Sequence, residues 1–114
     1  MLKIRSEQMS LYIEQIVNEF VDELRRQLRA ERPELIAHLS DDDARREISQ
    51  VVSRARHYGF TIEAVILRFV ILRFEQGTDF DSAAEVRRLL FDATAGEQRR
   101  IAQTEQYFKA AAGA

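Results

Sequence analysis

The sequence contains no cysteine, which excludes disulfide bonds and thiolate metal sites within the chain. Proline occurs once and glycine four times in 114 residues. So few helix-breaking residues, combined with apolar patterns of helical period, predict an all-α fold. His38 and His57 are the only histidines, and they do not form the i, i+4 pair of a helical metal site. We expect neither a catalytic nor a metal-binding role for them.

A basic excess and a long apolar run are also missing. The net charge of −2 argues against a nucleic-acid-binding module. The longest apolar run, residues 62–74, contains Arg68 and Arg73 and is shorter than the roughly 20 residues of a membrane span. The opening "MLKIRSEQMS" has no apolar segment typical of a secretory signal. These features predict a cytoplasmic protein, folded as a single helical domain over residues 1–114.

The first half of the chain predicts two long helices. Ser6 is expected to cap the first, which runs to about Arg32, and Ser40 the second, which runs to about Tyr58. In the first helix, apolar residues recur every three or four positions and predict a core-facing stripe: Met9, Ile13, Ile16, Phe20, Leu24 and Leu28, widened by Val17 and Val21. The stretch "DDDARREISQVV" has Arg46 where a calcium loop requires glycine and Val52 where it requires its last glutamate, so its aspartates are interpreted as helix-start residues.

The segment 62–74 is apolar on nearly every side, which is typical of a buried helix. We therefore predict a compact five- or six-helix bundle around this central helix. Its expected core residues are Ile62, Val65, Ile66, Phe69, Val70, Leu72 and Phe74. Gly59 and Gly77 are expected to end the helices before them. Asp81 or Ser82 should cap the next helix, Thr94 and Glu97 form a capping-box spacing, and the tail 110–114 is expected to fray.

Two surface regions are candidates for partner binding. Arg25, Arg26 and Arg29 lie on the polar side of the first helix, and arginine suits charge-assisted contacts with carboxylates. The stretch "GTDFD" places Asp79 and Asp81 on either side of Phe80. This loop is either an acidic patch with an aromatic anchor for a partner, or a turn in which Phe80 plugs the core.

No catalytic constellation can be assembled from these residues. The sequence contains neither a nucleophile elbow nor a phosphate-binding glycine loop nor a dinucleotide fingerprint. We therefore expect a protein that is not an enzyme and that needs no cofactor.

A family resemblance extends this interpretation. Residues 57–81 combine an aromatic-glycine turn, an acidic residue that opens an apolar helix, and a glycine-x-aspartate-phenylalanine-aspartate loop: Tyr58, Gly59, Phe60, Glu63, Gly77, Asp79, Phe80 and Asp81. With "SEQM" near the start and "LSDDD" at residues 39–43, this segment resembles small helical accessory or co-chaperone proteins encoded in bacterial type VI secretion effector clusters, beside PAAR and chaperone genes. The resemblance implies a protein that binds an effector-loading chaperone, or the effector itself, before export.

Two other functions remain open at this point. The chain could be an immunity protein that neutralises a cognate toxin, or a small helical homodimer with a structural role. The sequence does not identify the partner, the stoichiometry or the binding face.

Overall fold

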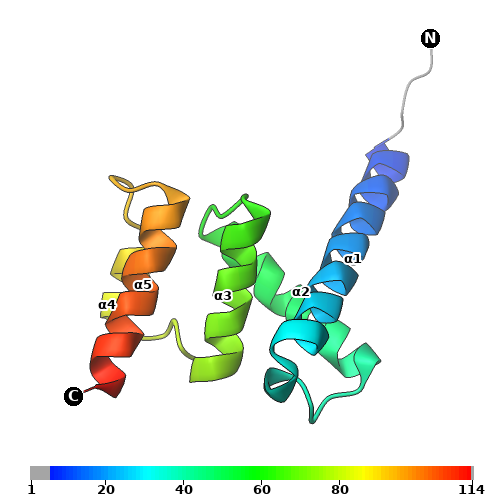
Figure 1. Ribbon diagram of the computed structural model, residues 1–114. Coiled ribbons are helices and arrows are strands. Elements are labelled where there is room, and N and C mark those ends of the chain that lie inside the picture. Colours follow the sequence, from blue (N-terminus) through cyan, green and yellow to red (C-terminus); the bar gives the residue numbers. More distant parts are fainter. Residues whose placement is uncertain (1–5, 114) are drawn as a thin grey trace. The chain divides into compact units, whose positions relative to one another are not determined.

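The computed structural model of the protein describes the backbone of residues 6–113 and the side chains of residues 13–113 (Figure 1). Its elements are α1 (Ser6–Glu31), the 3-10 helix η1 (Pro33–Leu35), α2 (Asp41–His57), α3 (Glu63–Gln76), α4 (Ala84–Leu90) and α5 (Glu97–Ala112). Residues 6–113 contain no strand, so the predicted all-α fold is confirmed. The expected cap Ser6 and the core residue Met9 lie outside the described side chains.

The chain divides into two compact units, Met1–Ser49 and Gln50–Ala114, with the boundary inside α2. The sequence alone predicts one domain and gives no sign of this division, because no proline, glycine or linker interrupts α2. We describe the first as unit 1 and the second as unit 2.

Unit 1 is built on the C-terminal half of α1. Val21, Leu24 and Leu28 are buried there, and η1 contacts the same helix. Ser40 caps α2 as predicted, because its Oγ accepts a hydrogen bond from the backbone N–H of Asp43 at 3.1 Å. Asp41, Asp42 and Asp43 fill the first turn of α2, where negative charge favours the helix dipole.

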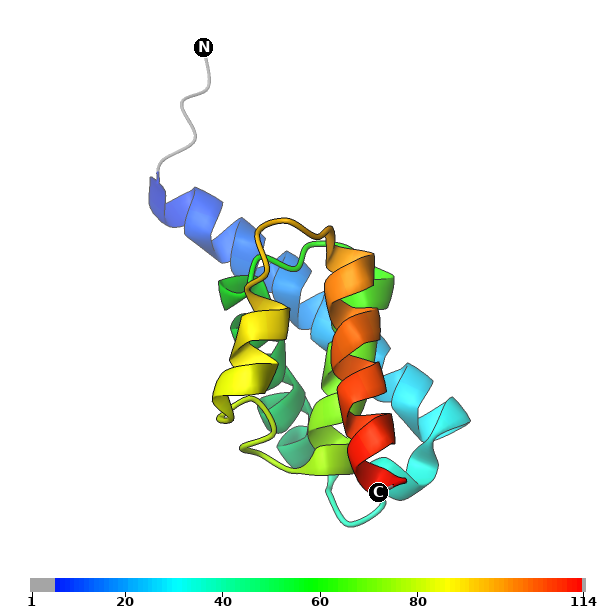
Figure 2. The same ribbon diagram turned by 90° about the vertical axis from the view of Figure 1, so that its left-hand side faces the viewer.

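Unit 2 contains a cluster of aromatic rings. In this unit α5 contacts both α3 and α4, and the three helices are seen together in Figure 2. Phe69 of α3 is fully buried, and its ring centroid lies 5.7 Å from that of Phe60 and 5.1 Å from that of Phe80. Arg68, on the same helix, forms an ion pair with Glu105 of α5. A charged residue inside the apolar run therefore finds a carboxylate partner at the edge of the core.

Two glycines end helices with backbone angles that other residues rarely adopt. Gly59 follows α2 with φ of 88° and Gly77 follows α3 with φ of 103°. Both positive φ values fall where glycine has no Cβ to clash. The predicted ends of these two helices are confirmed.

The start of α3 differs from the prediction. Ile62, expected in the core, precedes the first turn and is 42% exposed. Glu97 accepts backbone hydrogen bonds from Thr61 at 2.6 Å and from Ile62 at 3.0 Å. Its carboxylate thus occupies the positive end of α3 instead of pairing with Thr94, which bonds to Asp92. Burial raises the pKa of Glu97, but these hydrogen bonds outweigh burial and leave the pKa lowered.

The last two helices also differ in detail. The residue before α4 is Ala83, and neither Asp81 nor Ser82 caps the helix; Ser82 instead donates to the backbone oxygen of Asp79 at 2.8 Å. The helix α5 continues through Ala112, so the alanines expected to fray form its last turn.

Candidate functional site

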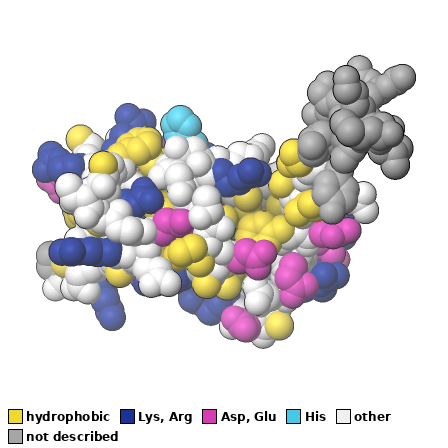
Figure 3. Space-filling model, turned by 90° about the horizontal axis from the view of Figure 1, so that it is seen from above, with side chains coloured by type: hydrophobic (Ala, Val, Ile, Leu, Met, Phe, Trp, Pro, Cys, Tyr) yellow, Lys and Arg dark blue, Asp and Glu magenta, His cyan; other side chains and the backbone are white. Residues whose placement is uncertain are grey.

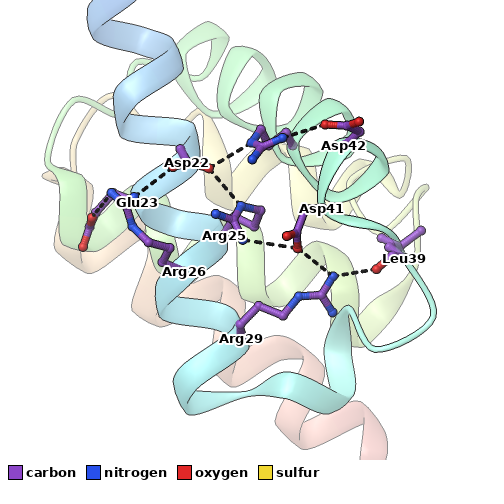
Figure 4. A network of polar contacts seen from close by, with 9 residues as sticks. Asp22, Glu23, Arg25, Arg26, Arg29, Leu39, Asp41 and Asp42 are labelled. Atoms are coloured by element: carbon purple, nitrogen blue, oxygen red, sulfur yellow. Dashed lines mark hydrogen bonds and ion pairs between the residues drawn. The ribbon is translucent and has the colours of Figure 1, made fainter.

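The arginines predicted to bind a partner lie in a network of contacts within unit 1 (Figure 4). The Arg25 side chain is only 13% exposed and pairs with Asp22 at 2.9 Å and with Asp41 at 3.2 Å. Arg29 donates to the backbone oxygens of Ile36 at 2.7 Å and Leu39 at 2.6 Å. These contacts give Arg25 and Arg29 a structural role, because they hold the segment after η1 against α1.

Arg26 is the most exposed of the three arginines, at 58% of its side chain. It pairs with Asp22 at 3.0 Å and with Glu23 at 2.8 Å, both on α1. Partner binding by this arginine stays a prediction. Exposed pairs of this kind contribute little to stability, so Arg26 could exchange its partners at small cost.

Asp22 is the centre of the network. It accepts hydrogen bonds from Arg45 and Arg25 at 2.9 Å each and from Arg26 at 3.0 Å. The bonds from Arg45 and Arg25, aided by the positive charge around the carboxylate, lower the pKa of Asp22 from 3.8 to about 2, against a smaller opposing effect of burial. Sequence inspection identifies the Asp22–Arg26 pair from its spacing but not the bond to Arg45, 23 positions away.

This network predicts a specific acid sensitivity. The pKa of Asp22 is lower in the folded chain than in the unfolded chain, so its contacts stabilise the fold above pH 3.8. That stabilisation is lost as the pH falls from 3.8 to about 2. We expect Asp22→Asn to be less stable than the wild type near neutral pH, and the difference to shrink across this window. Urea titrations at several pH values check this, and a difference that stays constant down to pH 2 or below would contradict it.

The acidic loop before α4 is divided between surface and core. Asp79 is exposed, whereas Phe80 is 5% exposed and Asp81 is 7% exposed. The ring of Phe80 contacts that of Phe69. Of the two alternatives for this loop, the structure therefore shows the turn in which Phe80 packs into the core. Asp81 forms an ion pair with Arg54 and accepts a hydrogen bond from the hydroxyl of Tyr58 at 2.7 Å. Neither Phe80 nor Asp81 has the exposed surface that an anchor for a partner needs.

A shallow cleft of about 490 Å³ opens in unit 2 beside Asp81. Its lining residues come from the end of α2 and from α4 and its flanks: Ser53, Arg54, His57, Tyr58, Asp81, Arg87 and Phe91. Phe91 is 49% exposed, and its ring centroid lies 4.4 Å from that of Tyr58. The cleft could accept a small side chain, with Phe91 as its apolar wall. Sequence reasoning missed Phe91, although it directly follows the apolar pair Leu89–Leu90.

The largest departure from the predicted core lies on α1. Ile13 and Ile16 are 47% and 48% exposed, although their spacing places them on the stripe that includes the buried Leu24. Among the described side chains of α1, fully buried residues begin at Val21. The polar contacts of the helix within unit 1 include those of Asp22 with Arg45 and of Arg29 with the backbone oxygen of Leu39. Among the described side chains of α1, the stripe is therefore buried from Val21 onward, whereas Ile13 and Ile16 are about half exposed.

We call Ile13, Ile16, Val17 and Phe20 the α1 face; Val17 and Phe20 are partly buried. In the space-filling view, hydrophobic side chains reach the surface in this part of α1, with acidic side chains close by (Figure 3). Glu14 and Glu19 belong to the same turns, and Glu19 accepts a hydrogen bond from Gln15 at 3.5 Å. Among the described side chains, neither glutamate has an ion-pair partner.

Comparison with known proteins gives no relative for this chain. No family model matches it, and no curated protein or solved structure shows a significant match. Among the residues that the structure describes, no helix combines the length and apolar character needed to cross a bilayer.

Proposed function

We propose that this protein is a non-catalytic accessory, similar to a co-chaperone, that binds a chaperone or effector during the loading of a type VI secretion effector in the cytoplasm. The observation that carries the binding role is the α1 face, where Ile13 and Ile16 are each almost half exposed. A contiguous patch of exposed apolar side chains marks an interaction site more strongly than single exposed residues do. A helix can present such a patch to a partner helix or groove. The secretion context comes from the sequence resemblance over residues 57–81.

Four of the residues that carry the resemblance have structural positions in unit 2. Gly59 and Gly77 adopt positive φ, and Phe60 and Phe80 lie in the aromatic core. Such positions give these residues a role in the fold. The α1 face belongs to unit 1 and includes none of these four residues.

Immunity to a toxin is the second candidate. The carboxylates of Glu14 and Glu19 beside the α1 face, which have no ion-pair partner among residues 13–113, would suit a basic toxin as well as a chaperone. Co-expression separates the two functions. An immunity protein rescues cells from the toxin encoded beside it without any other protein, whereas a loading accessory does not.

A capture experiment tests the proposed function. Tagged wild-type protein is expected to co-purify with the chaperone or effector of its own gene cluster, and the variant Ile13→Ser/Ile16→Ser is expected to retain less than about a tenth of that partner. Both side chains are already half exposed, so the variant should keep the far-UV circular dichroism of the wild type.

The matched control is Ile62→Ser/Phe91→Ser, which removes two equally exposed apolar side chains from unit 2. It is expected to capture the partner normally. If this control loses the partner and the α1 variant keeps it, binding takes place at unit 2 and the assignment to α1 is wrong. If the wild type captures no protein of the cluster, the loading function fails.

A further inference from the structure

The spacing of the α1 face fits a helical partner. Ile13, Ile16, Val17 and Phe20 occupy positions i, i+3, i+4 and i+7, which lie on one side of a helix over two turns. A partner helix whose own apolar residues have the same spacing could pack along this stripe. An extended strand would find no free backbone groups to pair with, because the backbone of α1 is hydrogen-bonded within the helix.

The charges around the stripe select the partner. Residues 13–23 contain Glu14, Glu19, Asp22 and Glu23 and no basic residue. Asp22 and Glu23 are paired with arginines of unit 1, whereas Glu14 and Glu19 have no cationic partner among the described side chains. On a helical projection at 100° per residue, Glu14 and Glu19 fall on opposite sides of the stripe. A bound helix would therefore meet one of these two carboxylates along each edge.

A second copy of this chain does not supply the missing charge. If two α1 faces packed together, each would bring the same four acids of residues 13–23 and no base. Like charges brought together at the rim of an interface oppose association. The same acids disfavour an anionic lipid surface.

We infer that the α1 face binds a basic amphipathic helix of another protein, with lysines or arginines of that helix pairing with Glu14 and Glu19. The inference rests on the proposed protein-binding role of the same face and adds the chemistry of the partner. Ile13 and Ile16 provide the apolar contact, and the two glutamates provide the selection against acidic or self-complementary partners.

Two synthetic helical peptides of about 18 residues test this chemistry. Both carry leucines at i, i+3, i+4 and i+7; one has lysines on each side of the leucine stripe, and the other has glutamates. Fluorescence anisotropy of labelled peptide with the full chain is expected to show binding of the lysine peptide and at least about tenfold weaker binding of the glutamate peptide. The affinity for the lysine peptide should fall as salt is raised.

Matched charge variants locate the effect. Glu14→Gln/Glu19→Gln is expected to weaken binding of the lysine peptide by about threefold to tenfold. The control Glu31→Gln/Glu85→Gln changes net charge by the same amount at two exposed glutamates that are not part of the α1 face, and it should bind as the wild type does. Ile13→Ser/Ile16→Ser should abolish binding.

Three outcomes would overturn the inference: equal binding of the two peptides, binding of neither, or equal losses in the two glutamate variants. A dimer in light scattering that Ile13→Ser/Ile16→Ser dissociates would also overturn it, because the occupant would then be a second copy. These results are independent of the capture experiment. A basic helix bound at the α1 face, with no capture of a secretion-cluster protein, would refute the proposed loading function and leave the partner chemistry standing.

Discussion

Replacing Phe69 with alanine is expected to lower the free energy of unfolding by about 3–5 kcal/mol. The side chain is fully buried, and its ring contacts those of Tyr58, Phe60 and Phe80 at centroid distances of 5.8, 5.7 and 5.1 Å. Truncation would leave a cavity between these rings, and neighbours in a well-packed core relax only partly into such a cavity. Urea denaturation followed by far-UV circular dichroism measures the effect.

Ile62→Ala is the control for this prediction, because Ile62 directly precedes the same helix and is 42% exposed. The Ile62→Ala substitution should lower the free energy of unfolding by less than about 1 kcal/mol. If Phe69→Ala also costs less than about 1 kcal/mol, α3 does not have the buried position described above.

Replacing Asp81 with alanine is expected to lower the free energy of unfolding by about 2–4 kcal/mol. Its carboxylate forms an ion pair with Arg54 and accepts a hydrogen bond from the hydroxyl of Tyr58. Asp81 is only 7% exposed. Its loss leaves the guanidinium of Arg54 without its carboxylate partner, and it leaves the hydroxyl of Tyr58, a residue that is 8% exposed, without its hydrogen-bond acceptor. The cost stays below that of a fully buried pair, because the Arg54 side chain is 33% exposed and can regain part of its hydration.

Asp79→Ala provides the comparison, since Asp79 lies in the same loop and is exposed. It should change the stability by no more than about 0.5 kcal/mol. A double-mutant cycle with Arg54→Ala isolates the ion pair, and a coupling energy near zero would show that Asp81 and Arg54 act independently. Equal effects of Asp79→Ala and Asp81→Ala would contradict the buried position of Asp81.

Local signals predicted much of the helical structure. Ser40 caps α2, and Gly59 and Gly77 end helices with positive φ, because each of these preferences depends on a few neighbouring residues. The apolar character of residues 62–74 identified a helix with Val65, Ile66, Phe69, Val70 and Leu72 buried. The prediction that Ile62 lies in the core was wrong, because periodicity does not show where a helix begins. Phe74, also predicted in the core, is only partly buried near the end of the helix.

The candidate site depends on contacts that sequence spacing does not encode. Arg54 and Asp81 are 27 positions apart, and Glu97 bonds to the backbone of Thr61 across 36 positions. The position of an arginine on the polar side of a helix does not indicate which carboxylate or carbonyl oxygen the side chain contacts. The structural role of Arg25 and Arg29 could therefore not be predicted from the sequence. A periodic stripe shows which residues share a face of α1, but not how far along the helix that face is covered.

The central claim is that the α1 face binds another protein, and site-specific photo-crosslinking at residue 16 tests it most directly. A photoreactive amino acid replaces Ile16 in the bacterium that encodes the chain, and adducts are identified by mass spectrometry. The control position is Gln98, which is exposed on α5. We predict an adduct at residue 16, absent at residue 98, with a chaperone or effector of the same secretion cluster, joined through a segment rich in lysine or arginine. An adduct between two copies of this chain, or the same adducts at both positions, would contradict the account.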